Sequence, residues 1–87
     1  MTMFHGSDAD MWYTLQSRMQ SADDRYGNFA SVHEALGVAM EEWDELRAAI
    51  HANKLDEVQG EAIDLAAVLL RLVIGLDNMK TRGRSIK

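Results

Sequence analysis

Apolar residues recur every three or four positions along three stretches of the chain, which is the spacing of a helix with one apolar side. The first predicted helix begins after Ser7, where Ser7-Asp8-Ala9-Asp10 resembles a capping box with acids in the first turn. A segment rich in turn-forming residues follows over residues 21–30 and is expected to separate this helix from the next. The apolar side of the first helix comprises Met11, Trp12, Leu15 and Met19.

Two further helices are predicted after the turn segment. Ser31-Val32-His33-Glu34 is a full capping box, and it opens a helix that is expected to end near His51. A connection over residues 52–54 leads to a third helix, which is expected to run from near Asp56 to about Asn78. The apolar stripe of the second helix comprises Leu36, Met40, Trp43, Leu46 and Ile50.

The third predicted helix is apolar on nearly all sides. Between Ala62 and Leu76 the only charged residues are Asp64 and Arg71. Such a helix must be covered on nearly all sides, and the other two helices of so short a chain do not easily supply that cover. We therefore expect an all-α fold in which a three-helix protomer forms a dimeric helical bundle, or a dimer of dimers. The alternative is that this segment is not a well-formed helix.

Composition and charge narrow the class of protein. The chain has 87 residues, of which 47% are hydrophobic and 26% charged, so it is not a disordered polar tract. It has no cysteine, which excludes disulfides, thiolate metal sites and thiol nucleophiles. Residues 1–79, the expected single domain, hold all 14 acidic and only five of the nine basic residues. This acidic body disfavours nucleic acid as a partner, and residues 80–87 form a basic tail.

No membrane-directed segment is expected from the sequence. Residues 1–4 lack the basic start and the apolar core of a signal peptide. The purely apolar run that contains residues 66–70 is too short to span a bilayer. A cytoplasmic location and no membrane partner are the expectations that follow.

Five acidic residues form the candidate chemical site. Spacings of three or four place Glu41, Glu42 and Glu45 close together on the second helix, and the same spacing joins Glu61 to Asp64 on the third. If these helices are antiparallel, the two acidic pairs can face each other across the helix–helix contact. Carboxylates without cysteine or histidine at ligand spacing suit a hard cation such as Mg²⁺ or Mn²⁺.

A solvated acidic surface is the alternative explanation for these residues. It is the better explanation for Glu41, Glu42 and Asp44 taken alone. Glu61, however, shares a helical row with Leu65, Val68 and Leu72, which are expected to be buried. A carboxylate at the head of a core-facing row is costly unless it is paired or bound to a metal. Glu61 therefore favours a cation site.

The acidic pattern also resembles a known family. Glu41-Glu42-Trp43-Asp44-Glu45, followed after a linker by Glu61-Ala62-Ile63-Asp64, fits the E-E-x-x-E…E-x-x-D signature of MazG-like all-α nucleoside triphosphate pyrophosphohydrolases, and the resemblance covers residues 26–76. It implies a Mg²⁺-dependent enzyme that cleaves a nucleoside triphosphate between the α and β phosphates. By motif position, Glu41 looks like an auxiliary catalytic carboxylate. The residues that look like metal ligands are Glu42, Glu45, Glu61 and Asp64.

Five further residues are candidates for substrate binding. Tyr26 and Phe29 are aromatic residues in the predicted turn segment, where they would stack on a nucleobase. Arg71 lies on the same side of the third helix as Asp64 and would reach a phosphate, although a structural salt bridge is the stronger interpretation. Lys80 and Arg82 would form a phosphate clamp, and a solvated tail is their alternative.

Two other functions remain open at the level of the sequence. One is a phosphoribosyl-ATP pyrophosphatase, a variant within the same superfamily. The other is a non-catalytic helical module that binds a partner protein. A carboxylate di-iron bundle is disfavoured, because no histidine stands three residues after a glutamate.

Overall fold

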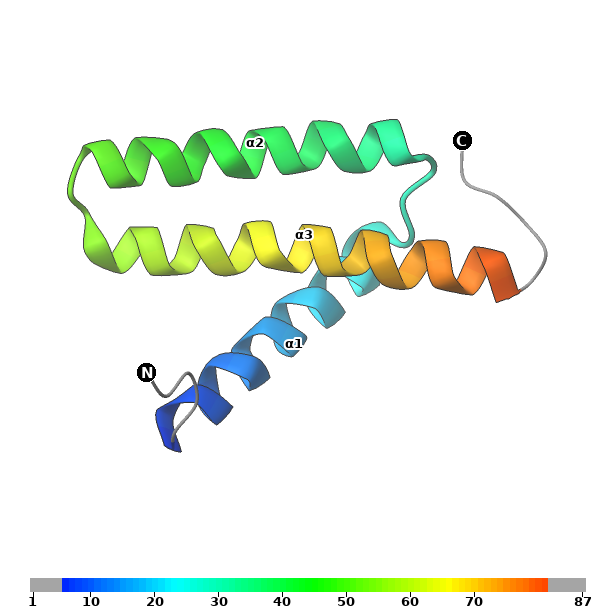
Figure 1. Cartoon of the computed structure of the whole chain (residues 1–87), viewed down its shortest axis with the longest axis horizontal. Coiled ribbons are helices and arrows are strands. Elements are labelled where there is room, and N and C mark those ends of the chain that lie inside the picture. The colour runs from blue at the N-terminus through cyan, green and yellow to red at the C-terminus, as the bar shows by residue number, and fades with distance from the viewer. Residues whose placement is uncertain (1–5, 82–87) are drawn as a thin grey trace.

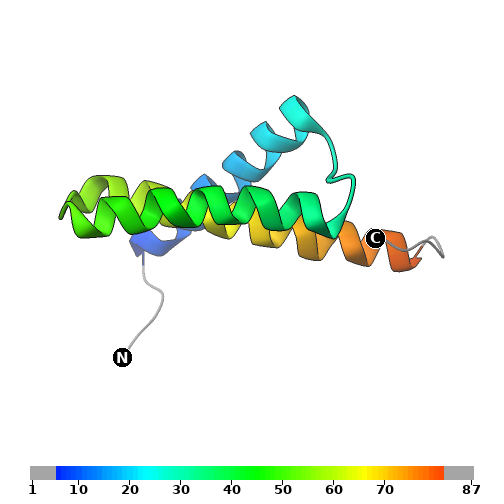
Figure 2. The same ribbon diagram turned by 90° about the horizontal axis from the view of Figure 1, so that it is seen from above.

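The protein is a bundle of three α-helices in the computed structural model (Figure 1). The structure describes the backbone of residues 6–81 and the side chains of residues 9–78. The helices are α1 (Gly6–Tyr26), α2 (Val32–His51) and α3 (Leu55–Thr81). α2 and α3 lie side by side and antiparallel, and α1 crosses α3 at a steep angle (Figures 1 and 2). Within the described residues the chain is all-α, as the sequence predicts.

α1 extends further than the sequence predicts. Residues 21–26, which were expected to form turns, continue the helix to Tyr26. The amide of Gln20 donates a hydrogen bond to the carboxylate of Asp24 at 2.9 Å, a contact between helical neighbours that supports the added turn. Gly27 ends the helix in the left-handed region, with φ of 71°, and its N–H donates to the carbonyl of Asp23 at 2.9 Å. The prediction was wrong because a glycine at this position, rather than the aspartates before it, terminates the helix.

α2 begins where the capping box predicts. The N–H of Glu34 donates to the hydroxyl oxygen of Ser31 at 3.1 Å, and Ser31 has the extended backbone of an N-cap residue. The carboxylate of Glu34 accepts a hydrogen bond from the N–H of Ala30 at 3.2 Å, one residue earlier than a standard capping box requires. Two backbone donors at the start of α2 are thus satisfied.

The turn from α2 to α3 is a Schellman motif centred on Asn53. Asn53 has a left-handed backbone, with φ of 56°. Its N–H donates to the carbonyl of Ile50 at 3.1 Å, and the N–H of Lys54 donates to the carbonyl of Ala49 at 3.1 Å. Asparagine is among the few residues with a side chain that adopt this conformation readily. The tight turn sets α3 antiparallel to α2.

Replacing Asn53 with alanine tests this turn. Alanine in the left-handed region is expected to lower the free energy of unfolding by about 1–2 kcal/mol. Glycine at the same position has no side chain to strain the turn, so Asn53→Gly is expected to remain within about 0.5 kcal/mol of the wild type. Denaturant unfolding of the three proteins at equal concentration measures both differences, and equal stability of the alanine and glycine variants would show that the turn is not held as described.

The contact between α2 and α3 is built from small residues. Ala35, Ala49, Ala67 and Val68 are the buried apolar residues, and no large side chain of the described chain is fully buried. Val68 confirms the expected burial of the row that contains Glu61, whereas Leu65 and Leu72 are only half-buried. Small side chains let the two helices approach closely, but they bury little apolar area.

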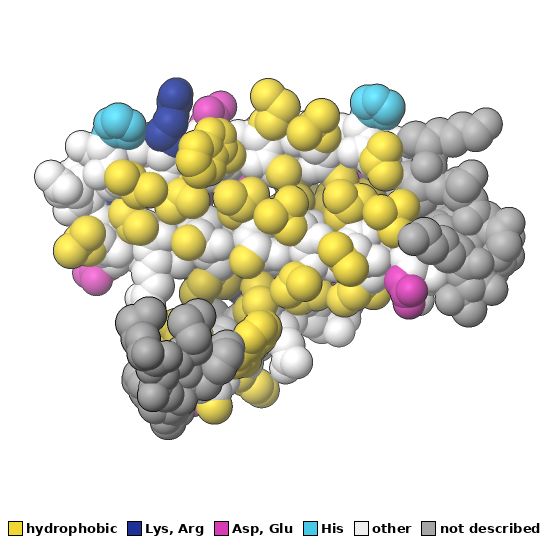
Figure 3. Space-filling model, in the orientation of Figure 1, with side chains coloured by type: hydrophobic (Ala, Val, Ile, Leu, Met, Phe, Trp, Pro, Cys, Tyr) yellow, Lys and Arg dark blue, Asp and Glu magenta, His cyan; other side chains and the backbone are white. Residues whose placement is uncertain are grey.

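Large apolar side chains cover one outer face of α2 and α3 (Figure 3). The predicted apolar stripe of α2 is largely exposed, whereas Ala35 and Ala49 of the same helix are buried. Leu69 and Val73, one helical turn apart, extend the exposed apolar surface along α3. We use the name apolar face for six exposed large apolar residues of these two helices, Leu36, Met40, Trp43, Ile50, Leu69 and Val73.

α3 ends three residues beyond its predicted end near Asn78. It continues to Thr81, past the expected limit of the domain at residue 79, and the rest of the basic tail lies outside the described residues. In the part of the chain that the structure describes, none of the helices combines the length and apolar character that a membrane crossing requires.

Candidate metal centre and adjoining cavity

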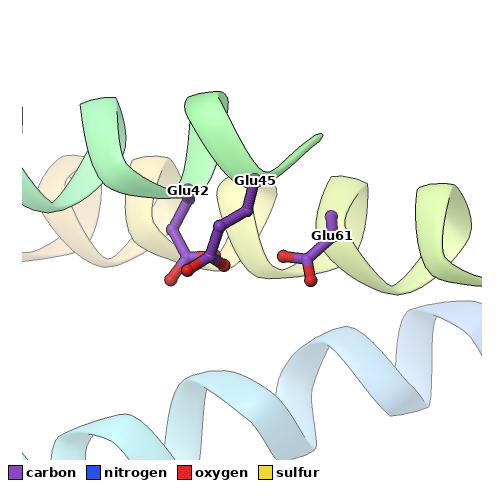
Figure 4. Close-up of side chains that lie close together, drawn as sticks. All are labelled: Glu42, Glu45 and Glu61. Carbon is purple, nitrogen blue, oxygen red and sulfur yellow. The ribbon is translucent and has the colours of Figure 1, made fainter. Parts of the chain in front are cut away.

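Three of the four predicted metal ligands come together between α2 and α3. Glu42 and Glu45 lie one turn apart on α2, and Glu61 lies opposite them near the start of α3 (Figure 4). One carboxylate oxygen of each residue lies within 4.8 Å of the corresponding oxygens of the other two. The antiparallel arrangement of the two helices thus brings acids from both motif halves to one place.

Burial and mutual repulsion perturb two of these carboxyl groups. The Oε2 atoms of Glu42 and Glu61 are buried and have no hydrogen-bond partner among the described residues. Burial, followed by the negative charges of Glu45, Asp64 and Glu61, raises the pKa of Glu42 from 4.5 to about 7. Burial and the adjacent Glu45 also raise the pKa of Glu61. Buried carboxylate oxygens without a donor fit a hard divalent cation, which would relieve both the burial cost and the repulsion.

Asp64, the fourth predicted ligand, is paired with a basic residue of α1. Its Oδ1 atom accepts a hydrogen bond from Nη1 of Arg18, and the pair is a salt bridge. Asp64 is close enough for its charge to raise the pKa values of Glu42 and Glu61. It is not one of the residues whose oxygens lie within 4.8 Å of one another. The structure therefore brings Asp64 to the edge of the acidic cluster and couples it to α1.

A cavity of about 610 Å³ adjoins the acidic residues. This volume lies in the range of small-molecule binding sites. All three helices and the loop after α1 contribute to its walls. Six of the candidate residues named from the sequence line it: Tyr26, Phe29, Glu41, Glu42, Asp64 and Arg71. Arg18 lines it as well.

Arg71 of α3 forms hydrogen bonds with the end of α1 and with the loop that follows it. Its Nε atom donates to Asp23 Oδ1 at 2.8 Å, and its Nη2 atom donates to the carbonyl of Gly27 at 2.8 Å. The guanidinium carbon lies 4.6 Å from the centre of the Phe29 ring, within the range of a cation–π contact. The side chain is only 7% exposed. The structural salt bridge considered from the sequence is therefore present, and it forms one wall of the cavity.

The remaining candidates differ in their surroundings. Glu41 is exposed at the cavity, and Tyr26 is 71% exposed beside it, with its ring 5.8 Å from the guanidinium carbon of Arg25. Lys80 lies in the last turn of α3, where side chains are not described, and Arg82 lies outside the described residues.

Arg18 is the site residue that sequence reasoning missed. It is one of two arginines on α1, and the helical pattern of the sequence places it on the polar side of that helix. Nothing in its local pattern distinguishes it from Arg25. Only the crossing of α1 over α3 brings one arginine, and not the other, to Asp64 (Figure 2).

The raised pKa of Glu42 predicts a pH dependence of stability without metal. Because the folded state binds a proton to Glu42 more tightly than the unfolded state, this stabilising contribution is complete below pH 4.5 and is lost as the pH rises through about 7. Thermal unfolding in a chelator, compared between pH 5 and pH 8, is expected to show a larger decrease for the wild type than for Glu42→Gln. Equal decreases in the two proteins would contradict the electrostatic description of the cluster.

Comparison with known proteins finds no matching family model, no similar curated protein and no similar solved structure.

Proposed function

We propose that the protein is a Mg²⁺-dependent nucleotide pyrophosphohydrolase. In this reaction water attacks a nucleoside or deoxynucleoside triphosphate, the bond between the α phosphorus and its bridging oxygen to the β phosphate breaks, and a monophosphate and pyrophosphate are released. One observation carries the proposal: glutamates from two antiparallel helices converge, with two buried oxygens that lack a donor, beside a cavity of about 610 Å³. The order and spacing of these acids resemble the MazG-like signature and support the same proposed activity.

Each candidate residue has a distinct role in this proposal. Glu42, Glu45, Glu61 and Asp64 would hold Mg²⁺, and Mn²⁺ would substitute for it. The bound cation would supply positive charge against the phosphate oxygens and lower the pKa of the attacking water. Glu41, exposed at the cavity, would orient that water or support the ligands. Phosphoryl chemistry depends mainly on positioning and electrostatics, so a small set of acids is sufficient.

The aromatic side chains at the cavity would receive the nucleobase. Tyr26 lines the cavity and is largely exposed, whereas the ring of Phe29 is already covered on one side by Arg71. Stacking on an exposed aromatic ring contributes about 1–3 kcal/mol per base. Lys80 and Arg82 are proposed to contact the phosphates together with the residues of the cavity.

A homodimer is part of the same proposal. Among the described residues of the single chain, the buried apolar side chains are three alanines and one valine, and the apolar face remains exposed. A second copy is the occupant that fits this face, because the face is formed of apolar side chains along two helices and can meet itself without like-charge repulsion (Figure 3). Pairing would give the apolar rows of α2 and α3 the cover that the protomer lacks.

Release of pyrophosphate tests the proposed reaction. A panel of ribonucleoside and deoxyribonucleoside triphosphates, with phosphoribosyl-ATP included, is incubated with the protein with and without Mg²⁺. We expect monophosphate and pyrophosphate from at least one substrate, with turnover abolished by a chelator and restored by Mg²⁺ or Mn²⁺. A protein that hydrolyses none of them would refute the proposal.

The exposed apolar face favours one other candidate function, that of a non-catalytic module which binds a different protein. In that case the acidic cluster would serve no reaction. Stable association of the purified protein with a heterologous helical partner, together with inertness toward every nucleotide, would support the module over the enzyme.

A further inference from the structure

We propose that Arg18 is an exchangeable counter-ion of the metal centre: it holds Asp64 in the metal-free protein and, when a divalent cation takes Asp64, it is released to bind the phosphates of the substrate. This inference rests on the proposed cation site. It assigns to α1 a role that neither half of the acidic motif contains, because Arg18 lies 46 residues before Asp64 in the chain.

The ion pair between Arg18 and Asp64 places a positive charge at a carboxylate that the proposed cation would bind. Arg18 donates to Asp64, and Asp64 in turn raises the pKa values of Glu42 and Glu61 through its charge. A guanidinium at this position offsets part of the negative charge of the cluster. A cation that binds the same carboxylate must displace the guanidinium or bind beside it, and like charges at such short range repel. Arg18 therefore competes with the metal.

The two arginines of the cavity differ in how firmly they are held. Arg71 is bonded to Asp23 and to the carbonyl of Gly27, stacks on Phe29, and is 7% exposed. Arg18 has Asp64 as its one partner among the described residues, and its side chain is 45% exposed. Occupation of Asp64 by a metal would thus free Arg18 and leave Arg71 in place. The guanidinium available to an anion in the cavity is that of Arg18.

The released guanidinium suits a phosphate group. Arginine presents several donors in a planar arrangement that matches phosphate oxygens, and such charge-assisted bonds are stronger than neutral ones. Arg18 already lines the cavity that Glu41 and Glu42 share. One side chain would then suppress the repulsion among the acids before the metal binds and neutralise the phosphates afterwards.

Two binding measurements with opposite expected signs test this inference. In the first, calorimetric titration with Mn²⁺ is expected to show about 3- to 10-fold tighter binding to Arg18→Gln than to the wild type, because the competing charge is gone. In the second, binding of inorganic tripolyphosphate in the presence of saturating Mg²⁺ is expected to weaken about 10-fold or more in Arg18→Gln. Arg18→Lys keeps the charge and is expected to fall between the two proteins in both measurements.

Arg47→Gln is the matched control. It removes the same charge from the exposed surface of α2, where Arg47 faces Asp44 at 4.0 Å, and is expected to leave both affinities unchanged. If Arg18 has only a structural role, Arg18→Gln would bind both Mn²⁺ and tripolyphosphate more weakly, which would overturn the inference. An unchanged affinity for either ligand in Arg18→Gln would overturn it as well. Failure of the wild type to bind Mn²⁺ would refute the proposed metal centre itself, and this inference with it.

Discussion

The variant Glu61→Gln is expected to lose Mg²⁺-dependent pyrophosphate release while its fold becomes more stable. Glu61 contributes a buried oxygen without a donor to the acidic cluster. An amide has the same shape but no negative charge, so it is a poor ligand for a hard cation. Loss of an outer-sphere partner of a metal typically costs about 10–100-fold in affinity or activity, and loss of a ligand is expected to cost at least about 100-fold.

The gain in stability follows from the same electrostatics. Burial and the adjacent Glu45 raise the pKa of Glu61, which means that the folded state disfavours its charged form. Removing that charge is expected to raise the melting temperature in a chelator at pH 8. The combination of higher stability and lost activity is characteristic of a residue retained for function.

Asp44→Asn is the matched control for this variant. Asp44 belongs to the same run of acids, but its side chain is 70% exposed and faces Arg47 on the outer side of α2. Its removal is expected to change activity by less than a factor of about two, since exposed charge pairs contribute little. Equal losses in the two variants would indicate a general effect of charge, and full activity of Glu61→Gln would contradict the assignment of Glu61 as a ligand.

If the proposed dimer forms, the variant Val73→Glu is expected to convert it into a monomer. Val73 lies on the apolar face and is 60% exposed in the single chain. In a symmetric dimer each substitution occurs twice, so two carboxylates would be buried without partners. The dissociation constant of the dimer is expected to rise about 100-fold or more. Sedimentation equilibrium over a range of concentrations measures this change directly.

Tyr13→Glu is the corresponding control for the apolar face. Tyr13 is 72% exposed on α1 and lies outside the apolar face, so its replacement is expected to leave the dimer intact. A wild type that sediments as a single chain of 9.8 kDa at all concentrations would contradict the dimer. Because little is buried within one protomer, dissociation of Val73→Glu is also expected to lower the cooperativity of unfolding.

The pairing of acids across two helices was predictable from the sequence, whereas the state of Asp64 was not. The spacing of three residues placed Glu42 with Glu45, and the short connection before α3 allowed an antiparallel return, which in the structure brings Glu61 opposite them. The partner of Asp64 comes from α1, and the position of α1 depends on tertiary packing rather than on a local pattern. Helical periodicity carries no information about a contact between residues 46 positions apart.

The helix boundaries show the same division between local and tertiary information. The capping box of Ser31 set the start of α2, because its hydrogen bonds involve only neighbouring residues. Whether the apolar stripe of α2 is buried or exposed could not be predicted in the same way. The apolar stripe that contains Trp43 is largely exposed, whereas Ala35 and Ala49 of the same helix are buried. Apolar periodicity identifies which residues lie on the same side of a helix. The element that packs against the helix determines which side is buried.

The location of Mn²⁺ in crystals tests the central claim most directly. Crystals grown with Mn²⁺ are measured near the manganese absorption edge, and anomalous difference density identifies the ion by its position. We predict a peak between α2 and α3 with carboxylate oxygens of Glu42, Glu45 and Glu61 as ligands, joined by Asp64 after its separation from Arg18. Absence of a peak among these residues, with Mn²⁺ bound elsewhere or not at all, would contradict the assignment of this cluster as a metal centre.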